Sequence, residues 1–213
     1  RKGDETMSRF SNRLLRLWWK KRGRAMSPTR VVAVAFALII LTGGLLLTLP
    51  VAAQDGQSHG FLTGLFTATS ATCVTGLVLG DTWTLWSGFG QIVILCLIEI
   101  GGLGFMSVAS TIIFLLRRKL GLRHRMVMAQ SLSVSDMASV VRLQKWAILG
   151  SIAIQLTGAL ILTLRFWPDF GLEQAIIWGI FHAVSAFCNA GFDIFGKIAP
   201  NASLIIFNND PVV

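Results

Sequence analysis

The chain has 213 residues, of which 54% are apolar and only 14% charged, and its mean hydropathy is +0.67. This composition departs from that of soluble proteins and predicts a membrane protein whose surface faces lipid. The net charge of +9 could suggest nucleic-acid binding, but ten of the 19 Lys and Arg residues lie in residues 1–30 and seven in residues 117–145. Charge gathered in two segments that flank apolar stretches indicates membrane topology, so no nucleic-acid partner is expected.

Three apolar segments are long enough to cross a bilayer, which needs roughly 20 helical residues. They are residues 31–49, about 86–116 and 146–164. Because basic residues flank these segments at 1–30 and 117–145, the positive-inside rule places both basic segments in the cytoplasm. The expectation is therefore a multi-pass protein of the cell (plasma) membrane with a cytoplasmic N-terminus. The loop after the first span and everything after about residue 165 would face the exterior.

A shorter apolar segment, Gly60 to Thr72, lies between the first two spans. As a helix it would be about 18 Å long, which is half a membrane. Irregular backbone at membrane depth is tolerated only where it is buried in protein or lines a water-filled cavity. A half-length helix that runs into a glycine-containing bend between two spans therefore predicts a re-entrant pore loop.

The same segment recurs 115 residues later in the chain. GLFTATSATCVTGL (64–77) and GIFHAVSAFCNAGF (179–192) are identical at seven of 14 positions, including the pairs Cys73/Cys188 and Gly76/Gly191. Chance similarity between two apolar helices would not place paired cysteines and glycines in one register. The repeat predicts a duplicated unit of span, half-helix, bend and span.

The expected ligand of these bends is a cation. A half-helix that enters from outside points its partially negative C-terminal end at the membrane centre. Gly76 and Gly191 can adopt positive φ, so that successive carbonyl groups turn toward an axis and replace the water shell of an alkali ion. The predicted filter residues are Thr72, Cys73, Val74, Thr75, Gly76, Phe187, Cys188, Asn189, Ala190 and Gly191. Asp81 and Asp193 either raise the cation concentration at the outer mouth or serve as solvated loop acids or helix caps.

Other polar and glycine residues have competing interpretations. Glu99 lies inside the second span, where it could attract cations in a cavity or hydrogen-bond a neighbouring helix. The glycines Gly101, Gly102 and Gly104 favour close packing over a helix bend. His182 is interpreted as a packing or hydrogen-bonding residue of the second half-helix. The three cysteines have no metal-site spacing, and no catalytic triad or paired carboxylate indicates an enzyme.

Four sequence segments carry a family resemblance: ATCVTGL, SAFCNAGFD, EIGGLGF and NNDPVV. Together they resemble the membrane-spanning subunit of the Trk/Ktr/HKT superfamily of potassium transporters, most closely the Ktr type, over residues 25–213. The resemblance implies an all-α polytopic membrane protein in which four units of span, pore half-helix, filter loop and span surround one pore. About one and a half units would be present here. The expected parts are a basic N-terminal segment (1–30), a first unit (31–119), a cytoplasmic connector (120–145) and an incomplete second unit (146–213).

The resemblance also implies a function and partners. The expected activity is potassium transport through a selectivity filter of backbone carbonyls, as the pore-forming subunit of a potassium uptake system. The alternative is an alternating-access secondary transporter coupled to sodium or protons. No nucleotide-binding motif occurs in the chain, so no cofactor is expected beyond the transported potassium ion. The implied partners are a second copy of the full-length subunit, a cytoplasmic nucleotide-binding regulatory ring and the lipid bilayer.

Overall fold

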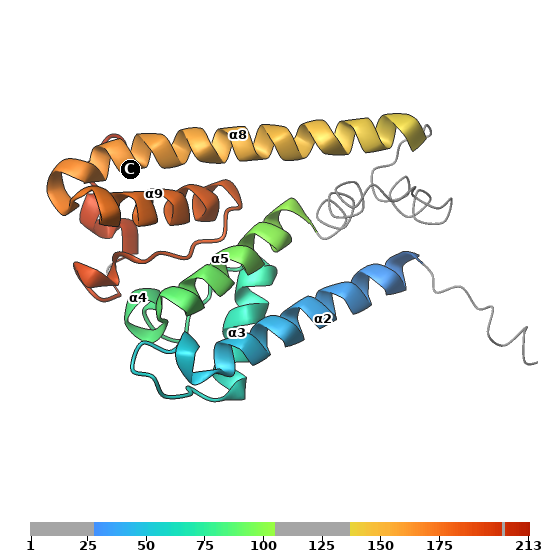
Figure 1. The fold of residues 1–213 in the computed structure, drawn as a ribbon, viewed down its shortest axis with the longest axis horizontal. Coiled ribbons are helices and arrows are strands. Elements are labelled where there is room, and N and C mark those ends of the chain that lie inside the picture. The colour runs from blue at the N-terminus through green and yellow to red at the C-terminus, as the bar shows by residue number, and fades with distance from the viewer. Residues whose placement is uncertain (1–27, 105–136, 202) are drawn as a thin grey trace, which may run out of the picture. The chain divides into compact units, whose positions relative to one another are not determined.

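The computed structural model describes residues 28–104, 137–201 and 203–213. Residues 1–33 and 34–213 form separate units, and the packing reported below lies within the second. The elements in chain order, shown in Figure 1, are α2 (Pro28–Thr48), η1 (Pro50–Ala52), α3 (Phe61–Thr72), α4 (Thr82–Leu85), α5 (Gly88–Leu103), α8 (Met137–Phe170), α9 (Leu172–Phe187), η2 (Phe195–Lys197) and η3 (Ser203–Phe207). The part of the chain that the structure describes is thus helical, with one isolated β-bridge between Ala53 and Trp86.

The three predicted spans correspond to α2, α5 and α8. Helix α2 nearly coincides with the first, and α5 begins at Gly88, two residues after the predicted start of the second. Residues 105–116 of that span lie outside the described residues, as do residues 1–27 of the basic segment and residues 120–136 of the connector. Among the described helices, one stretch is long and apolar enough to cross a membrane, the 29 residues Arg142–Phe170. Shorter apolar helices cover Val32–Thr48, Gly88–Leu103 and Leu172–Phe187.

Helix α8 presents apolar side chains that the described chain leaves uncovered. Ile154, Leu156 and Leu160 are each at least 60% exposed. A soluble protein buries such a helix in its core, whereas a lipid-facing helix keeps an apolar surface. Trp146 and Trp167, near the two ends of the predicted third span, are also exposed, as is typical of tryptophans at membrane interfaces.

Each half-helix crosses the preceding span at a glycine. A Cβ on Gly64 of α3 would lie 2.7 Å from the carbonyl oxygen of Gly44 on α2. A Cβ on Gly179 of α9 would lie 2.8 Å from the carbonyl oxygen of Ala159 on α8. Such distances allow only glycine at the crossing points. Gly44 and Ala159 are themselves 115 residues apart, so the duplication found in the half-helices extends into the incoming spans.

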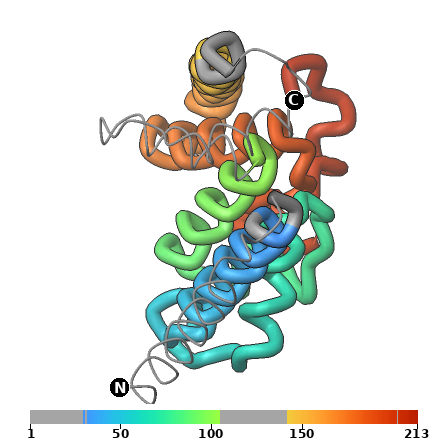
Figure 2. The backbone as a smooth tube through the Cα atoms, turned by 90° about the vertical axis from the view of Figure 1, so that its right-hand side faces the viewer, coloured from blue at the N-terminus to red at the C-terminus, as the bar shows by residue number. Residues whose placement is uncertain are grey.

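Helix α5 lies between the two half-helices and packs against both α3 and α9 (Figure 1, Figure 2). Ser87 caps its start by accepting a hydrogen bond from the Gly90 amide, and Gly104, at φ 77°, ends it. Ile94 and Ile98 are completely buried in the core that α5 shares with its neighbours. The helix that closes the first unit therefore also supports the half-helix of the second.

An aromatic cluster joins α8, α9 and the segment after the second bend. Phe166, Trp178 and Phe195 are fully buried, and their ring centroids lie 5.2–6.1 Å apart in edge-to-face contacts. Trp178 lies on the face of α9 that meets Phe166 and Phe170 of α8, so its indole is part of this core.

Candidate ion-binding site

The first bend follows α3 and begins with a Schellman motif. The Val74 amide donates to the Ala71 carbonyl at 3.3 Å, and the Thr75 amide donates to the Ser70 carbonyl at 3.0 Å. Val74 has φ 56°, which is rare for a β-branched residue and costs on the order of 1–3 kcal/mol. The surrounding structure therefore holds this residue in a strained conformation at the position where the chain turns.

The second bend follows α9 and has the same two backbone hydrogen bonds as the first bend. The Asn189 amide donates to the Ala186 carbonyl at 3.0 Å, and the Ala190 amide donates to the Ser185 carbonyl at 2.8 Å. Asn189 has φ 57°, a conformation that asparagine tolerates better than valine. Each residue in these two hydrogen bonds lies 115 residues after its counterpart in the first bend, so the two bends share one backbone conformation.

The two predicted filter glycines meet in space. Gly76 has φ 71° and Gly191 has φ 73°. Both glycines thus have the positive φ that was predicted to turn successive carbonyl groups toward an axis. A Cβ on Gly76 would lie 2.7 Å from the Ala190 carbonyl oxygen, and a Cβ on Gly191 would lie 3.5 Å from the Gly76 Cα. Segments that are far apart in the sequence are thus in van der Waals contact at the two glycines.

The chemistry available at this contact is that of neutral backbone dipoles. Residues 72–76 and 187–191 contain no charged side chain. Within the described ranges, no group of three or more His, Cys, Asp or Glu side chains is placed to hold a metal ion. Both half-helices end here, so their C-terminal partial negative charges add to the carbonyl dipoles. Such an arrangement favours a cation.

Side chains of α9 hold the segment that follows the second bend. The His182 Nδ1 lies 2.7 Å from the Trp178 carbonyl oxygen, and its Nε2 accepts a hydrogen bond from the Ile194 amide at 3.3 Å. The proton of this neutral imidazole is therefore on Nδ1. The Ser185 hydroxyl donates to the Phe192 carbonyl at 2.6 Å. His182 is thus a hydrogen-bonding residue, in agreement with its interpretation from the sequence.

The first bend is supported differently. The Ser70 and Thr75 hydroxyl oxygens are 2.9 Å apart, within hydrogen-bonding distance across the bend. Thr67, which aligns with His182, is buried. The backbone conformation is therefore shared by the two bends, whereas the equivalent hydroxyls of Ser70 and Ser185 bond to different partners.

Two glycines of α5 lie against the ends of the half-helices. A Cβ on Gly101 would collide with the carbonyl group of Thr72, and a Cβ on Gly102 would collide with the Cys188 side chain. Thr72 is the last residue of α3, and Cys188 caps α9. Gly101 and Gly102 therefore permit close packing, which was the favoured interpretation from the sequence. For Gly104 that interpretation is wrong, because a Cβ there would meet no atom within 4 Å and its φ of 77° ends α5.

The two candidate outer-mouth acids have different surroundings. Asp81 is buried and caps α4 by accepting a hydrogen bond from the Thr84 amide at 2.9 Å. Its second oxygen accepts from the Asn201 amide at 3.0 Å. Burial raises the pKa of the Asp193 carboxyl above its ordinary value, and the charge of Asp81 adds to this effect. The helix-cap interpretation thus fits Asp81, while a role of either acid in attracting cations stays a prediction.

The family model described as "Cation transport protein" (TrkH) matches residues 11–213. The "Potassium/sodium uptake protein NtpJ" of Enterococcus hirae is 44% identical over 178 residues, which cover 83% of this chain and 40% of that protein. The "Ktr system potassium uptake protein B" of Bacillus subtilis is 42% identical over 187 residues, covering 88% of this chain and 40% of the relative. A protein of the same name from Vibrio alginolyticus is 34% identical over 194 residues, with coverages of 91% and 41%.

The chain spans about two fifths of the length of these curated relatives. The match to the family model, in contrast, covers nearly the whole chain and includes both bends. The chain therefore belongs to the TrkH family of cation transport proteins and is an all-helical, polytopic membrane protein.

Proposed function

We propose that this chain contributes two filter segments to the pore of a potassium uptake system. In this proposal, the backbone carbonyl groups of residues 72–76 and 187–191 bind a potassium ion that has shed water. The observation that carries the proposal is the contact between the two bends at Gly76 and Gly191, where both half-helices end. Relatives named as potassium or potassium/sodium uptake proteins support the choice of ion.

Neutral dipoles suit conduction better than a carboxylate does. A ring of carbonyl groups can replace the hydration shell of an alkali ion and still release it to the next site. The helix ends add about half a negative elementary charge each, spread over the last turn. A formally charged ligand in the filter would hold the ion more strongly and slow its exit.

The packing beyond the bends favours a pore over an alternating-access carrier. Carriers are often built from inverted repeats, whose half-helices enter from opposite faces. Here α4, which follows the first bend, packs against η2, which follows the second, and Lys197 lies over the Trp83 ring at 5.7 Å. Both bends therefore lead to the same side. This arrangement supports two half-helices that enter the membrane in parallel.

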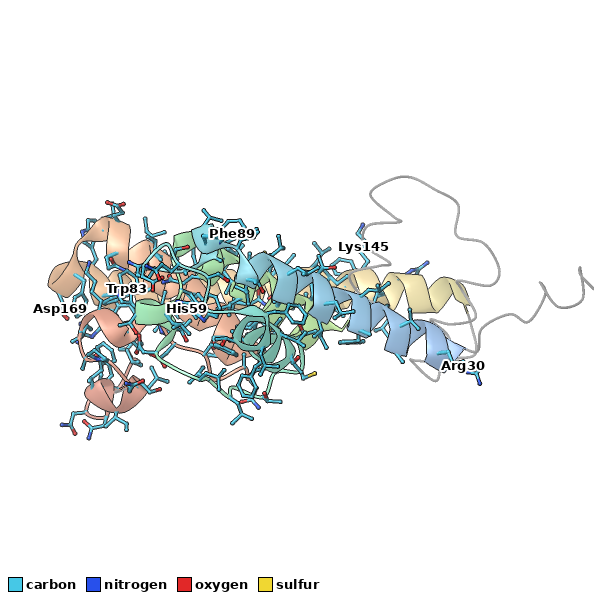
Figure 3. All side chains as sticks on the ribbon, turned by 90° about the horizontal axis from the view of Figure 1, so that it is seen from below. Arg30, His59, Trp83, Phe89, Lys145 and Asp169 are labelled. Carbon is cyan, nitrogen blue, oxygen red and sulfur yellow. The ribbon has the colours of Figure 1, made fainter. Side chains whose placement is uncertain are left out.

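The proposed location is the cell membrane with the N-terminus in the cytoplasm. Figure 3 shows Lys145 and Asp169 toward opposite ends of α8, with His59 and Trp83 toward the Asp169 end. In this topology the basic segments 1–30 and 117–145 lie inside, and the segments after the two bends lie outside.

The proposed partners follow the naming of the relatives. Two of them are described as components of a Ktr system, which is a designation for an assembly of more than one part. We infer a second copy of the pore-forming subunit and a separate cytoplasmic ring that binds the regulatory nucleotide. This chain is expected to bind potassium as its transported ligand, to carry no cofactor and to perform no enzymatic reaction.

Cation uptake into proteoliposomes tests the proposal. The complete transporter, reconstituted with its regulatory partner, is expected to take up potassium and rubidium in preference to sodium at equal external concentrations. Empty liposomes provide the control for leakage. Absence of cation uptake, or uptake that occurs at all potassium concentrations only when a sodium or proton gradient drives it, would contradict a potassium pore.

A further inference from the structure

A carboxylate inside the membrane-spanning part of α5 lies beside the second bend. The Gln155 Nε2 of α8 donates to both carboxylate oxygens of Glu99, at 3.2 Å to Oε1 and 3.0 Å to Oε2. The Cys188 thiol donates to Oε2 at 3.7 Å. One acidic side chain thus links the outgoing helix of the first unit to the incoming helix and the filter segment of the second.

Helix α5 makes both a steric contact and a hydrogen bond with Cys188. Gly102 lies three residues after Glu99 on α5, and a Cβ there would come within 2.6 Å of the Cys188 Cβ. Cys188 and Gln155 are both buried. The repeat counterpart of Cys188 in the first bend, Cys73, is exposed. The contact with Glu99 therefore distinguishes the second bend from the first.

A displacement of Cys188 would be transmitted to the filter segment, because this residue comes directly before the second bend. It caps α9, and the next residue, Asn189, turns the chain at φ 57°. Any movement of the cap rotates the carbonyl groups that follow, up to Gly191. The carboxylate of Glu99 contacts this cap through the Cys188 thiol, so its effect on ions would be transmitted through Cys188.

We propose that Glu99, oriented by Gln155, is a positioning residue that fixes the second filter segment and thereby contributes to selection of potassium over sodium. The proposal rests on the function proposed above. It assigns Glu99 a role as a hydrogen-bond acceptor between helices and not as a binding site for the transported ion. Interchanging the two side chains separates these roles, because the helices can still be hydrogen-bonded when the charge has moved from α5 to α8.

The test compares single and interchanged variants of the complete transporter in proteoliposomes. Glu99→Ala and Gln155→Leu each remove the link, and we expect either to lower the ratio of potassium to sodium uptake by about tenfold. The double variant Glu99→Gln/Gln155→Glu keeps both side-chain sizes and a donor–acceptor pair, so its ratio should return to within about twofold of the wild-type value. Thr157→Val on α8 is the matched control, because its exposed hydroxyl bonds only to Ala153 of its own helix among the contacts given by the structure.

The uptake ratio is measured at equal amounts of folded protein, because a merely structural role would change yield and not ion preference. A wild-type ratio in both single variants would overturn the proposal. Failure of the interchanged variant to recover selectivity would also overturn it, since the charge at position 99 would then be what matters. If Glu99→Ala does not accumulate in the membrane, Gln155→Leu gives the deciding ratio. Loss of the proposed function itself is recognised separately, by wild-type protein that shows no preference for potassium.

Discussion

Replacing Gly76 by serine is expected to remove most of the preference for potassium over sodium. A side chain at this position meets two obstacles, because the backbone has φ 71° and the new Cβ would lie 2.7 Å from the Ala190 carbonyl oxygen. The left-handed conformation costs roughly 1–2 kcal/mol for a residue other than glycine. The steric contact falls on a proposed ion ligand, so relief of the clash must move that carbonyl group. We expect the potassium-to-sodium uptake ratio to fall by about tenfold or more, since 1.4 kcal/mol corresponds to tenfold.

Serine variants of two other glycines provide a comparison for the loss of selectivity expected in Gly76→Ser. Gly191 has nearly the same φ, but a Cβ there would lie 3.5 Å from Gly76, which is an ordinary contact. Gly191→Ser should therefore reduce selectivity less than Gly76→Ser. Gly56 also has φ 71°, and a Cβ there would meet no atom within 4 Å. Gly56→Ser therefore introduces the same unfavourable backbone conformation at a position outside the filter, without a steric clash. Equal selectivity in the Gly76 and Gly56 variants would contradict the assignment of Gly76 to the ion-binding site.

Replacing Gly101 by alanine is expected to destabilise the protein and to impair selectivity. The added Cβ would lie 2.8 Å from the Thr72 carbonyl carbon and still closer to its oxygen. Because these are backbone atoms, α5 and the end of α3 must separate, and overpacking of this kind typically costs about 1–3 kcal/mol. The melting temperature of the solubilised transporter and the uptake ratio should both fall.

Gly150→Ala is the matched control for this change. Gly150 is also helical, and a Cβ there would meet no atom within 4 Å. Alanine is favoured over glycine in a helix by about 1 kcal/mol, so this variant should be neutral or slightly more stable. A melting temperature that falls equally in both variants would show that glycine is needed for reasons other than the contact of Gly101 with Thr72.

The sequence predicted the helices well wherever hydrophobic length or a glycine sets their limits. The first half-helix, predicted from Gly60 to Thr72, is Phe61–Thr72 with Gly60 as its N-terminal cap. The third span was predicted over residues 146–164, and α8 extends beyond both ends of it, from Met137 to Phe170. In the last turns of α8, Arg165 forms ion pairs with Asp169, one turn ahead, and with Asp210. Ion pairs across a helical turn are not visible to a criterion based on hydrophobicity.

The repeat identified the bend residues but not their contacts. Paired glycines at a fixed offset predict two similar bends, since positive φ is a local property. The contact of Gly76 with Ala190 depends on how α5 packs between the two half-helices, which no local pattern encodes. Two hydrogen bonds were also missed, one from the Ile194 backbone amide to His182 and one from the Asn201 backbone amide to Asp81. Every residue type except proline has a backbone amide, so these donors cannot be recognised from residue types.

The location of a bound alkali ion tests the central claim most directly. Crystals of the complete transporter grown in rubidium or thallium allow the ion to be identified by its anomalous scattering. We predict a peak at the contact of the two bends, coordinated by backbone carbonyl oxygens between Thr72 and Gly76 and between Phe187 and Gly191. An ion held instead by the carboxylates of Asp81 or Glu99, with the carbonyl groups of both bends unoccupied, would contradict this claim.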